Sequence, residues 1–239
     1  MTDAELAERA GIPLRILLAI RAVESGGRAS AVRFEPHVFW RIRKGLPRSA
    51  TGGQIRDSLT AAERAAVPYT PCSPDWRAAN GLPPCMRGSE IYTQAASLVG
   101  SETSRSAFER AFRVNPAAAV EATSWGHYQV LGGHLLSTQG GTPAQAVAAF
   151  DRDPAGVGRA MLVSWFAGNE TARALAQRGE VEALAMLYNG SEAWGRAMRR
   201  ALERLPAGTG STASSASSGL GALALALVVG FGIYRWSRR

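Results

Sequence analysis

A glutamate stands at the end of the most apolar helix that the sequence predicts. Apolar side chains occupy almost every face of residues 13–23, with only two arginines among them, which predicts a helix buried in a core. Glu24 follows at the C-terminal end, where burial and the negative end of the helix dipole both raise the pKa of a carboxyl group. Gly26 and Gly27 favour a left-handed stop and leave the carboxyl open to another molecule.

This arrangement stabilises a helix poorly, but it suits proton donation. A carboxyl that stays protonated near neutral pH, beside backbone without side chains, has the properties of a general acid that protonates a glycosidic oxygen. The alternative is an ordinary glutamate at a frayed helix end. Glu24 by itself does not decide between the two.

The chain divides after Pro206, where its composition changes. Its 239 residues are enough for one globular domain, which we expect over residues 1–206. Residues 207–218 are Gly, Ser, Thr and Ala, which is typical of a flexible linker. Residues 219–236 predict a C-terminal transmembrane helix, with a basic tail at 237–239. A disordered tail or a self-association segment is the alternative.

The net charge of +8 favours an anionic partner, which could be nucleic acid, a lipid surface or a bacterial cell wall. No zinc-finger or RNP pattern occurs, and no Arg-rich block is interleaved with aromatic residues, so we expect no nucleic-acid binding. The sequence contains no metal-ligand cluster and no phosphate loop, and we expect no cofactor. Cys72 and Cys85 flank a Pro-rich loop and either form a disulfide or remain two reduced thiols.

Helix boundary signals predict a mainly α fold with at most a small β element after Glu24. Capping side chains followed by proline begin several of the helices. We expect residues 33–40 to be irregular or to form a short strand, since Pro36 argues against a long helix there. The predicted helices are 2–11, 13–24, 56–66, 89–100 and 104–114, one from 115 and one from 142, and then 153–168, 169–179 and 191–205.

Four short motifs follow one another in an order that has a counterpart in a known family. They are ESGG at residues 24–27, FEPHVFW at 34–40, SWGHYQVLG at 124–132 and YNG at 188–190. Over roughly residues 14–204 they resemble the ordered signature of the N-acetylmuramidase family of phage and bacterial peptidoglycan hydrolases. More distantly, the order is similar to that of goose-type lysozymes and lytic transglycosylases. The resemblance implies an α+β lysozyme-like fold.

The resemblance also implies cleavage of the β-1,4 bond between N-acetylmuramic acid and N-acetylglucosamine in peptidoglycan, with Glu24 as the general acid. Glu35 is the candidate for a second catalytic carboxylate, and a structural glutamate that binds backbone is the alternative. Substrate contacts are expected from side chains of all four motifs, namely Ser25, His37, Ser124, Tyr128, Gln129, Tyr188 and Asn189.

Several of these side chains have a purely structural interpretation too. Ser124 could cap a helix that carries Gln129 on its surface, and the aromatic rings of the third motif could belong to the core. The YNG motif is expected to end a helix, with the Tyr188 hydroxyl directed at the site and Asn189 in the left-handed conformation. A purely capping role of the motif is the alternative.

The sequence departs from the family pattern in two places. The segment 28–33 is short and basic, whereas family members often carry a longer acidic or Gly-rich insert there. Ser191 stands at a position where proline is typical of the family. Neither departure touches Glu24, but both concern the surroundings of the motifs and therefore the binding subsites.

We expect a membrane-anchored enzyme, held in the bacterial inner membrane by residues 219–236, that acts on the periplasmic cell wall. A phage origin is consistent with this, and phage lysis or virion proteins are then further partners. Two rival functions remain at this point. One is a lytic transglycosylase with 1,6-anhydro products, and the other is a non-catalytic glycan-binding or virion structural protein.

Overall fold

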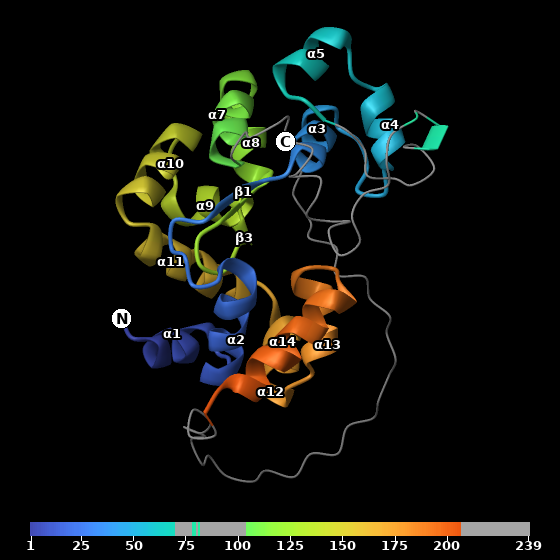
Figure 1. Ribbon diagram of the computed structural model, residues 1–239. Helices are drawn as coiled ribbons and strands as arrows, with labels where there is room; N and C mark the ends of the chain where they lie inside the picture. The colour runs from blue at the N-terminus through green and yellow to red at the C-terminus, as the bar shows by residue number, and fades with distance from the viewer. Residues whose placement is uncertain (70–77, 80, 82–103, 207–239) are drawn as a thin grey trace.

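The computed structural model describes residues 1–69, 78–79, 81 and 104–206. The described chain is mainly helical, with one small sheet (Figure 1). The helices are α1 (Asp3–Ala10), α2 (Leu14–Ser25), α3 (Pro36–Arg43), α4 (Gly52–Asp57), α5 (Ala61–Ala66), α7 (Ser104–Val114), α8 (Pro116–Glu121), α9 (Gly132–Gln139), α10 (Pro143–Arg152), α11 (Pro154–Ala167), α12 (Glu170–Arg178), α13 (Val181–Tyr188) and α14 (Glu192–Arg204).

The sheet joins two of the sequence motifs. Its strands are β1 (Val32–Phe34), β2 (Thr123–Trp125) and β3 (Val130–Leu131), paired antiparallel in the order β1-β2-β3. In this register Arg33 lies opposite Ser124. The pairing therefore places the segment that follows Glu24 directly beside the SWGHYQVLG motif, although nearly a hundred residues separate them in the chain.

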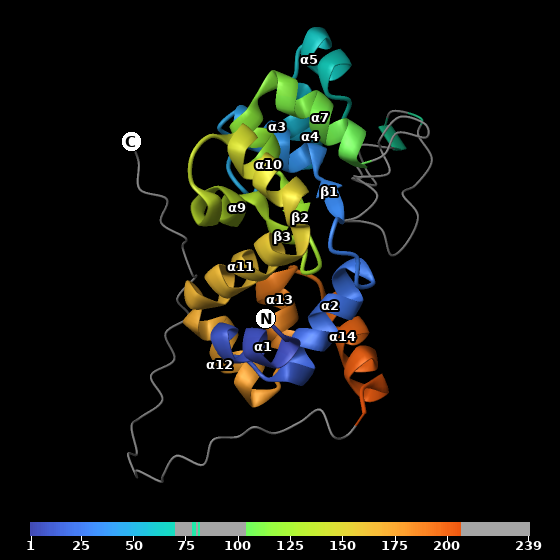
Figure 2. The same ribbon diagram turned by 90° about the vertical axis from the view of Figure 1, so that its left-hand side faces the viewer.

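The helices form two groups with α11 between them (Figures 1 and 2). One group contains α1, α2, α12, α13 and α14, and the other contains α3, α4, α5, α7, α8, α9, α10 and the sheet. Helix α11 packs against α1 and α12 on one side and against α9 and α10 on the other. Glu24 ends a helix of the first group and Glu35 precedes a helix of the second, so the two carboxyl groups come from different halves of the molecule.

Helix α14 packs along α2 and fixes its position. Trp194 and Met198 of α14 are buried, at 4% and 0% exposure. At the other end of the contact, the guanidinium of Arg15 in α2 donates to the backbone oxygen of Leu202, at 2.8 Å. The first long helix of the chain is thus held by the last described one.

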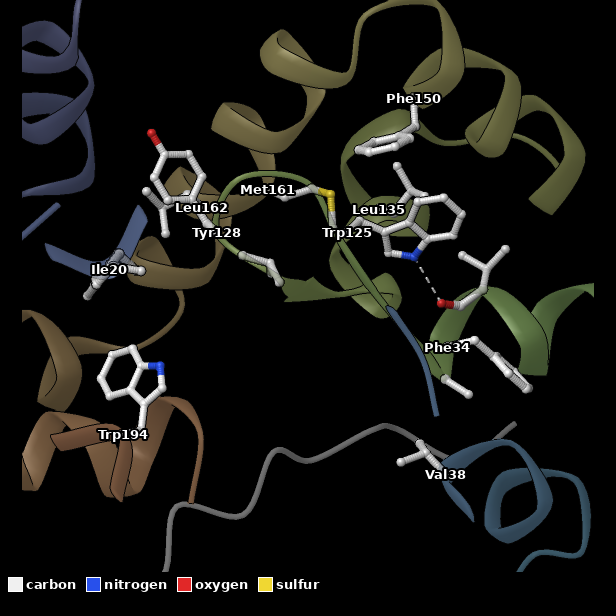
Figure 3. Packing of buried hydrophobic residues seen from close by; sticks show 14 of the residues in the cluster. Ile20, Phe34, Val38, Trp125, Tyr128, Leu135, Phe150, Met161, Leu162 and Trp194 are labelled. Atoms are coloured by element: carbon white, nitrogen blue, oxygen red, sulfur yellow. Dashed lines mark hydrogen bonds between the residues drawn. The ribbon is translucent and has the colours of Figure 1, made fainter. Parts of the chain in front are cut away.

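The core of the second group is built around Trp125 (Figure 3). Its ring makes edge-to-face contacts with Phe108 and Phe150, at centroid distances of 5.1 Å and 4.9 Å. Its indole N–H donates to the backbone oxygen of Val120 at 3.3 Å. The structure thus assigns Trp125 to the core.

Most of the predicted helix boundaries are confirmed, two predictions differ from the structure, and one helix was missed. Of the segment 33–40, Arg33 and Phe34 lie in the short strand β1 as predicted, but the residues from Pro36 onward form helix α3, because proline is accepted in the first turn of a helix, where its missing N–H has no partner to lose. The single helix predicted over 56–66 is two helices, since Thr60 forms its own capping box with Glu63 and starts α5 anew. Helix α9 was not predicted, because it begins with two glycines.

The remaining structural predictions lie outside the described residues. They are the helix at 89–100, the cysteines Cys72 and Cys85, the linker 207–218, the membrane span 219–236 and the basic tail 237–239. Of the helices in the described ranges, none combines the length and the apolar character that a membrane crossing requires.

Candidate active site

Glu24 lies in the last turn of α2, beside an open stretch of backbone. Gly26 ends the helix in the left-handed conformation, with φ of 58°, and Gly27 follows with φ of 85°. A Cβ atom added at either glycine would meet nothing within 4 Å. The partly buried Glu24 side chain therefore borders on space that a ligand can enter.

A cavity of about 700 Å³ begins at this point. Its wall runs from the end of α2 along β1 to the start of α7 and to the junction of α10 and α11. Among the described residues that line it are Glu24, Arg28, Arg33, Gln129 and Asp151. Neither Glu35 nor His37 is among them.

The environment of Glu24 raises the pKa of its carboxyl group to about 7. Burial is the main cause, because it disfavours the charged form. The positive charge of Arg33 opposes the shift, as do the Trp194 indole and the Asn189 amide, whose Nδ2 lies 3.5 Å from Glu24 Oε1. The nearby charge of Glu35 raises the pKa further. Glu24 is consequently about half protonated at neutral pH.

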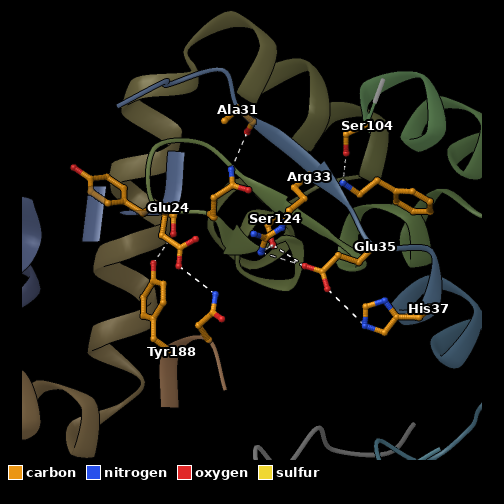
Figure 4. A network of polar contacts seen from close by, with 12 residues as sticks. Glu24, Ala31, Arg33, Glu35, His37, Ser104, Ser124 and Tyr188 are labelled. Carbon is orange, nitrogen blue, oxygen red and sulfur yellow. Dashed lines mark hydrogen bonds and ion pairs between the residues drawn. The ribbon is translucent and has the colours of Figure 1, made fainter. Parts of the chain in front are cut away.

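Glu35, at the start of α3, forms a polar cluster with Arg33 of β1 and Ser124 of β2 (Figure 4). Its Oε1 accepts hydrogen bonds from the Ser124 hydroxyl at 3.3 Å and from the Arg33 guanidinium at 3.4 Å. Burial raises the pKa of Glu35, and the charge of Arg33 and the hydrogen bond from Ser124 oppose this. Arg33 thus acts on both carboxyl groups, and it stands between the two acids in Figure 4.

His37 is neutral at pH 7. Burial lowers the pKa of its imidazole to about 4, and the positive charges of Arg41 and Arg33 lower it as well. Its Nε2 lies 3.8 Å from Glu35 Oε2. Because the pKa of Glu35 is raised while that of His37 is lowered, the two groups are not both charged to a large extent at any pH, and acid does not turn this contact into an ion pair. The substrate contact predicted for His37 stays a prediction.

Ser124 and Gln129 do not occupy the structural positions that the alternative interpretation gave them. Ser124 lies in strand β2 and not at a helix cap, and its hydroxyl donates to Glu35. Gln129 lies in the tight turn between β2 and β3, with φ of 49°. Its amide donates to the backbone oxygens of Gly126 at 2.9 Å and Ala31 at 3.3 Å. Gln129 therefore ties this turn to the chain just before β1, while it also lines the cavity.

The side chains of Tyr128, Tyr188 and Ser25 make contacts within the protein. Tyr128 is 1% exposed and belongs to the core, as the alternative interpretation allowed. The hydroxyl of Tyr188 donates to the backbone oxygen of Tyr128 at 2.6 Å, which joins α13 to the turn between β2 and β3. The hydroxyl of Ser25 accepts from the N–H of Gly27 at 3.1 Å and so stabilises the end of α2.

Asn189 was predicted in the left-handed conformation, and this was wrong. Its φ and ψ are −126° and −14°, and Gly190 takes the left-handed position with φ of 71°. Glycine adopts the left-handed conformation at position 190 without steric strain. The Asn189 amide points toward Glu24.

Sequence reasoning missed Arg33, although a signal for it existed. Arg33 and Glu35 are two residues apart at the end of a strand, and side chains with this spacing share one face. It also missed Trp194, because no local pattern links α14 to the end of α2. No group of three or more His, Cys, Asp or Glu side chains in the described part of the chain is arranged to hold a metal ion.

Comparison with known proteins gives a related fold and a family. The structure is similar to the crystal structure of the Burkholderia AP3 phage endolysin, with a TM-score of 0.55, 23% sequence identity and coverage of 85% of this chain and 71% of that chain. At this identity the likeness concerns the fold. No curated protein sequence matches the chain. The sequence model of the N-acetylmuramidase family matches residues 13–205, which include Glu24 and every site residue described above. The chain therefore belongs to the N-acetylmuramidase family.

Proposed function

We propose that this protein is a muramidase that cleaves the β-1,4 bond between N-acetylmuramic acid and N-acetylglucosamine in peptidoglycan, with Glu24 as the general acid. Membership of the N-acetylmuramidase family supports the substrate. The observation that carries the mechanism is the position of Glu24, whose carboxyl has a pKa of about 7 and lines a cavity of about 700 Å³. This volume is within the range of cavities that hold small ligands.

In the proposed reaction, Glu24 first donates a proton and later takes one back. The carboxyl donates it to the glycosidic oxygen as the bond from that oxygen to the sugar C1 breaks, and an oxocarbenium-like centre develops at C1. Water then attacks C1 and returns a proton to the Glu24 carboxylate. A pKa near the working pH suits both steps, because the group must first give a proton and then accept one.

We assign Glu35 a positioning role. Its carboxylate is occupied by the Ser124 hydroxyl and the Arg33 guanidinium, and it is not among the described residues that line the cavity. By holding Arg33, Glu35 fixes the positive charge that acts on Glu24. The proposed mechanism therefore uses one acid.

The decisive variant is Glu24→Gln. The amide keeps the shape of the side chain but has no proton to give, so we expect wall cleavage to fall by about two to three orders of magnitude. Turbidity of purified peptidoglycan and mass spectrometry of the released fragments measure this. Glu121→Gln is the matched control, because Glu121 is also a partly buried glutamate with a raised pKa but does not line the cavity.

The products of the wild-type protein separate the rival functions. New reducing ends support hydrolysis, whereas 1,6-anhydro ends assign the protein to the lytic transglycosylases. If purified walls bind the wild-type protein but are never cut, the protein is a glycan-binding module. If Glu24→Gln cuts walls at the wild-type rate, Glu24 is structural and the proposal fails.

We further propose a phage origin and action on the bacterial cell wall, with lysis proteins as partners. The fold shared with a phage endolysin supports this assignment. Anchoring to the inner membrane through residues 219–236 stays a prediction from the sequence, because these residues lie outside the described part of the chain.

A further inference from the structure

Among the described residues, three arginines line the cavity that begins at Glu24, and two of them already have carboxylate partners. Arg105 binds both carboxylate oxygens of Asp151, at 2.8 Å and 2.7 Å, and Glu109 at 3.1 Å. Arg33 lies 3.4 Å from Glu35. The positive charges of these two side chains are thus balanced within the protein.

Arg28 differs from the other two. It is exposed, and its Nε donates to the backbone oxygen of Ser25 at 3.3 Å. Among the described residues no carboxylate lies within ion-pair distance of its guanidinium. Its outer nitrogens are therefore available to a ligand.

The position of Arg28 brings its positive charge close to Glu24. It follows Gly26 and Gly27, where the backbone is bare, and the bond to Ser25 ties the guanidinium to the residue beside Glu24. A ligand that approaches the Glu24 carboxyl across the two glycines therefore meets Arg28 at the rim of the cavity. This residue also begins the short basic segment 28–33, which the sequence comparison with the family left unexplained.

We propose that Arg28 binds a carboxylate carried by the muramyl residue of the substrate. This inference rests on the proposed function, since the sugar backbone itself is uncharged. The substituent on O-3 of muramic acid ends in a carboxyl group, which is either free or extended by an acidic peptide. A guanidinium pairs with carboxylates in a planar, charge-assisted geometry, and chitin-type glycans offer it nothing. Arg28 thus distinguishes muramyl glycans from polymers of N-acetylglucosamine.

Binding by the inactive Glu24→Gln protein tests this proposal. The probes are the N-acetylglucosamine–muramic acid disaccharide with its peptide, the same compound with all its carboxyls amidated, the disaccharide with a free lactyl carboxyl, and chitobiose. Isothermal titration calorimetry or NMR titration at low salt gives the dissociation constants. Arg28→Gln is added to the same background, and Arg200→Gln, another exposed arginine on α14, is the matched control.

We expect Arg28→Gln to weaken binding of the carboxylate-bearing probes by about tenfold and to leave the amidated probe and chitobiose unchanged. An effect on the free lactyl compound assigns the contact to the lactyl carboxyl, and an effect on the peptide compound alone assigns it to the peptide. Equal weakening of charged and amidated probes, unchanged binding of all probes, or no measurable binding overturns the proposal. Because these are equilibrium measurements, a wild-type protein that fails to cut walls refutes the proposed function separately.

Discussion

The carboxyl group of Glu24 keeps its proton at a pH where an exposed glutamate has lost it, and the cause is burial at the end of a helix. Arg33 limits the effect, since its charge favours the ionised carboxylate. Two opposing influences therefore set a pKa of about 7, and each of them can be changed separately.

The first prediction concerns pH. Glu24 must be protonated to act, so kcat/KM should fall above an apparent pKa near 7, by about tenfold per pH unit. Arg33→Gln removes a charge that stabilises the carboxylate, and it should move this alkaline limb to higher pH. Initial rates on solubilised glycan strands across pH 5 to 9 measure both effects. An alkaline limb that stays in place in Arg33→Gln would contradict the assignment to Glu24, and Arg200→Gln is the control for general loss of charge.

The second prediction separates a one-acid from a two-acid mechanism. Glu35→Gln should lower kcat by less than about tenfold, because a neutral oxygen still accepts from Ser124 and Arg33. Steady-state kinetics on the substrate used for Glu24→Gln gives the comparison. A loss as large as that of Glu24→Gln would show that Glu35 takes part in the chemistry.

At the scale of single residues, the sequence predicts the raised pKa of Glu24 and the open backbone beside it better than it predicts the other residues around Glu24. Glu24 could be singled out from the sequence because the apolar helix, its end and the two glycines all lie within one short stretch. Asn189 reaches it from 165 positions away, and Arg33 acquires its role only when β1 pairs with β2. Contacts of this kind depend on tertiary structure and leave no local pattern.

At the scale of elements, the predictions succeed where a helix carries its own boundary signals. Five predicted capping side chains each accept a hydrogen bond from a backbone N–H in the first turn of the helix that follows. They are Thr2, Asn115, Thr142, Asp153 and Asn169. Helix α9 has no such cap, and its two leading glycines argue against a helix in isolation. Packing decides there, because the start of α9 lies against α8 and the sheet.

Helix α9 provides the third prediction. A Cβ atom at Gly132 would lie 1.7 Å from the backbone oxygen of Val120, which is also the acceptor for the Trp125 indole. Gly132→Ala should therefore lower the free energy of unfolding by about 3 kcal/mol or more. Gly133→Ala is the matched control, since a Cβ there meets nothing within 4 Å.

For Gly133→Ala we expect a change within about 1 kcal/mol, in the stabilising direction, because alanine favours a helix over glycine. Urea denaturation of both variants gives the free energies. Equal stability of the two proteins would mean that α9 does not approach α8 as closely as the structure shows.

At the scale of the whole molecule, α11 joins the two helix groups, and α14 completes the first of them. Helix α11 packs against both groups, and α14 covers α2, which carries Glu24. The cavity is lined from both groups, so its shape depends on these contacts and not on any single element.

The fourth prediction follows from the contact of α14 with α2. A protein that ends after Pro206 should keep its wall-cleaving activity, whereas one that ends after Gly190 should lose it together with cooperative unfolding. The shorter protein lacks Trp194 and Met198, which are buried, and the oxygen that binds Arg15. Turbidity assays and circular dichroism during heating compare the two. Full activity without α14 would show that α2 holds Glu24 in place unaided.

The hydrogen bond between Arg15 and Leu202 joins two helices that are synthesised far apart in time. A ribosome makes Glu24 long before it makes α14, the helix that packs against α2. Until α14 has emerged, α2 lacks one of the helices that pack against it, and the environment that raises the pKa of Glu24 is incomplete. The site proposed for wall cleavage is thus complete only when α14 has been translated.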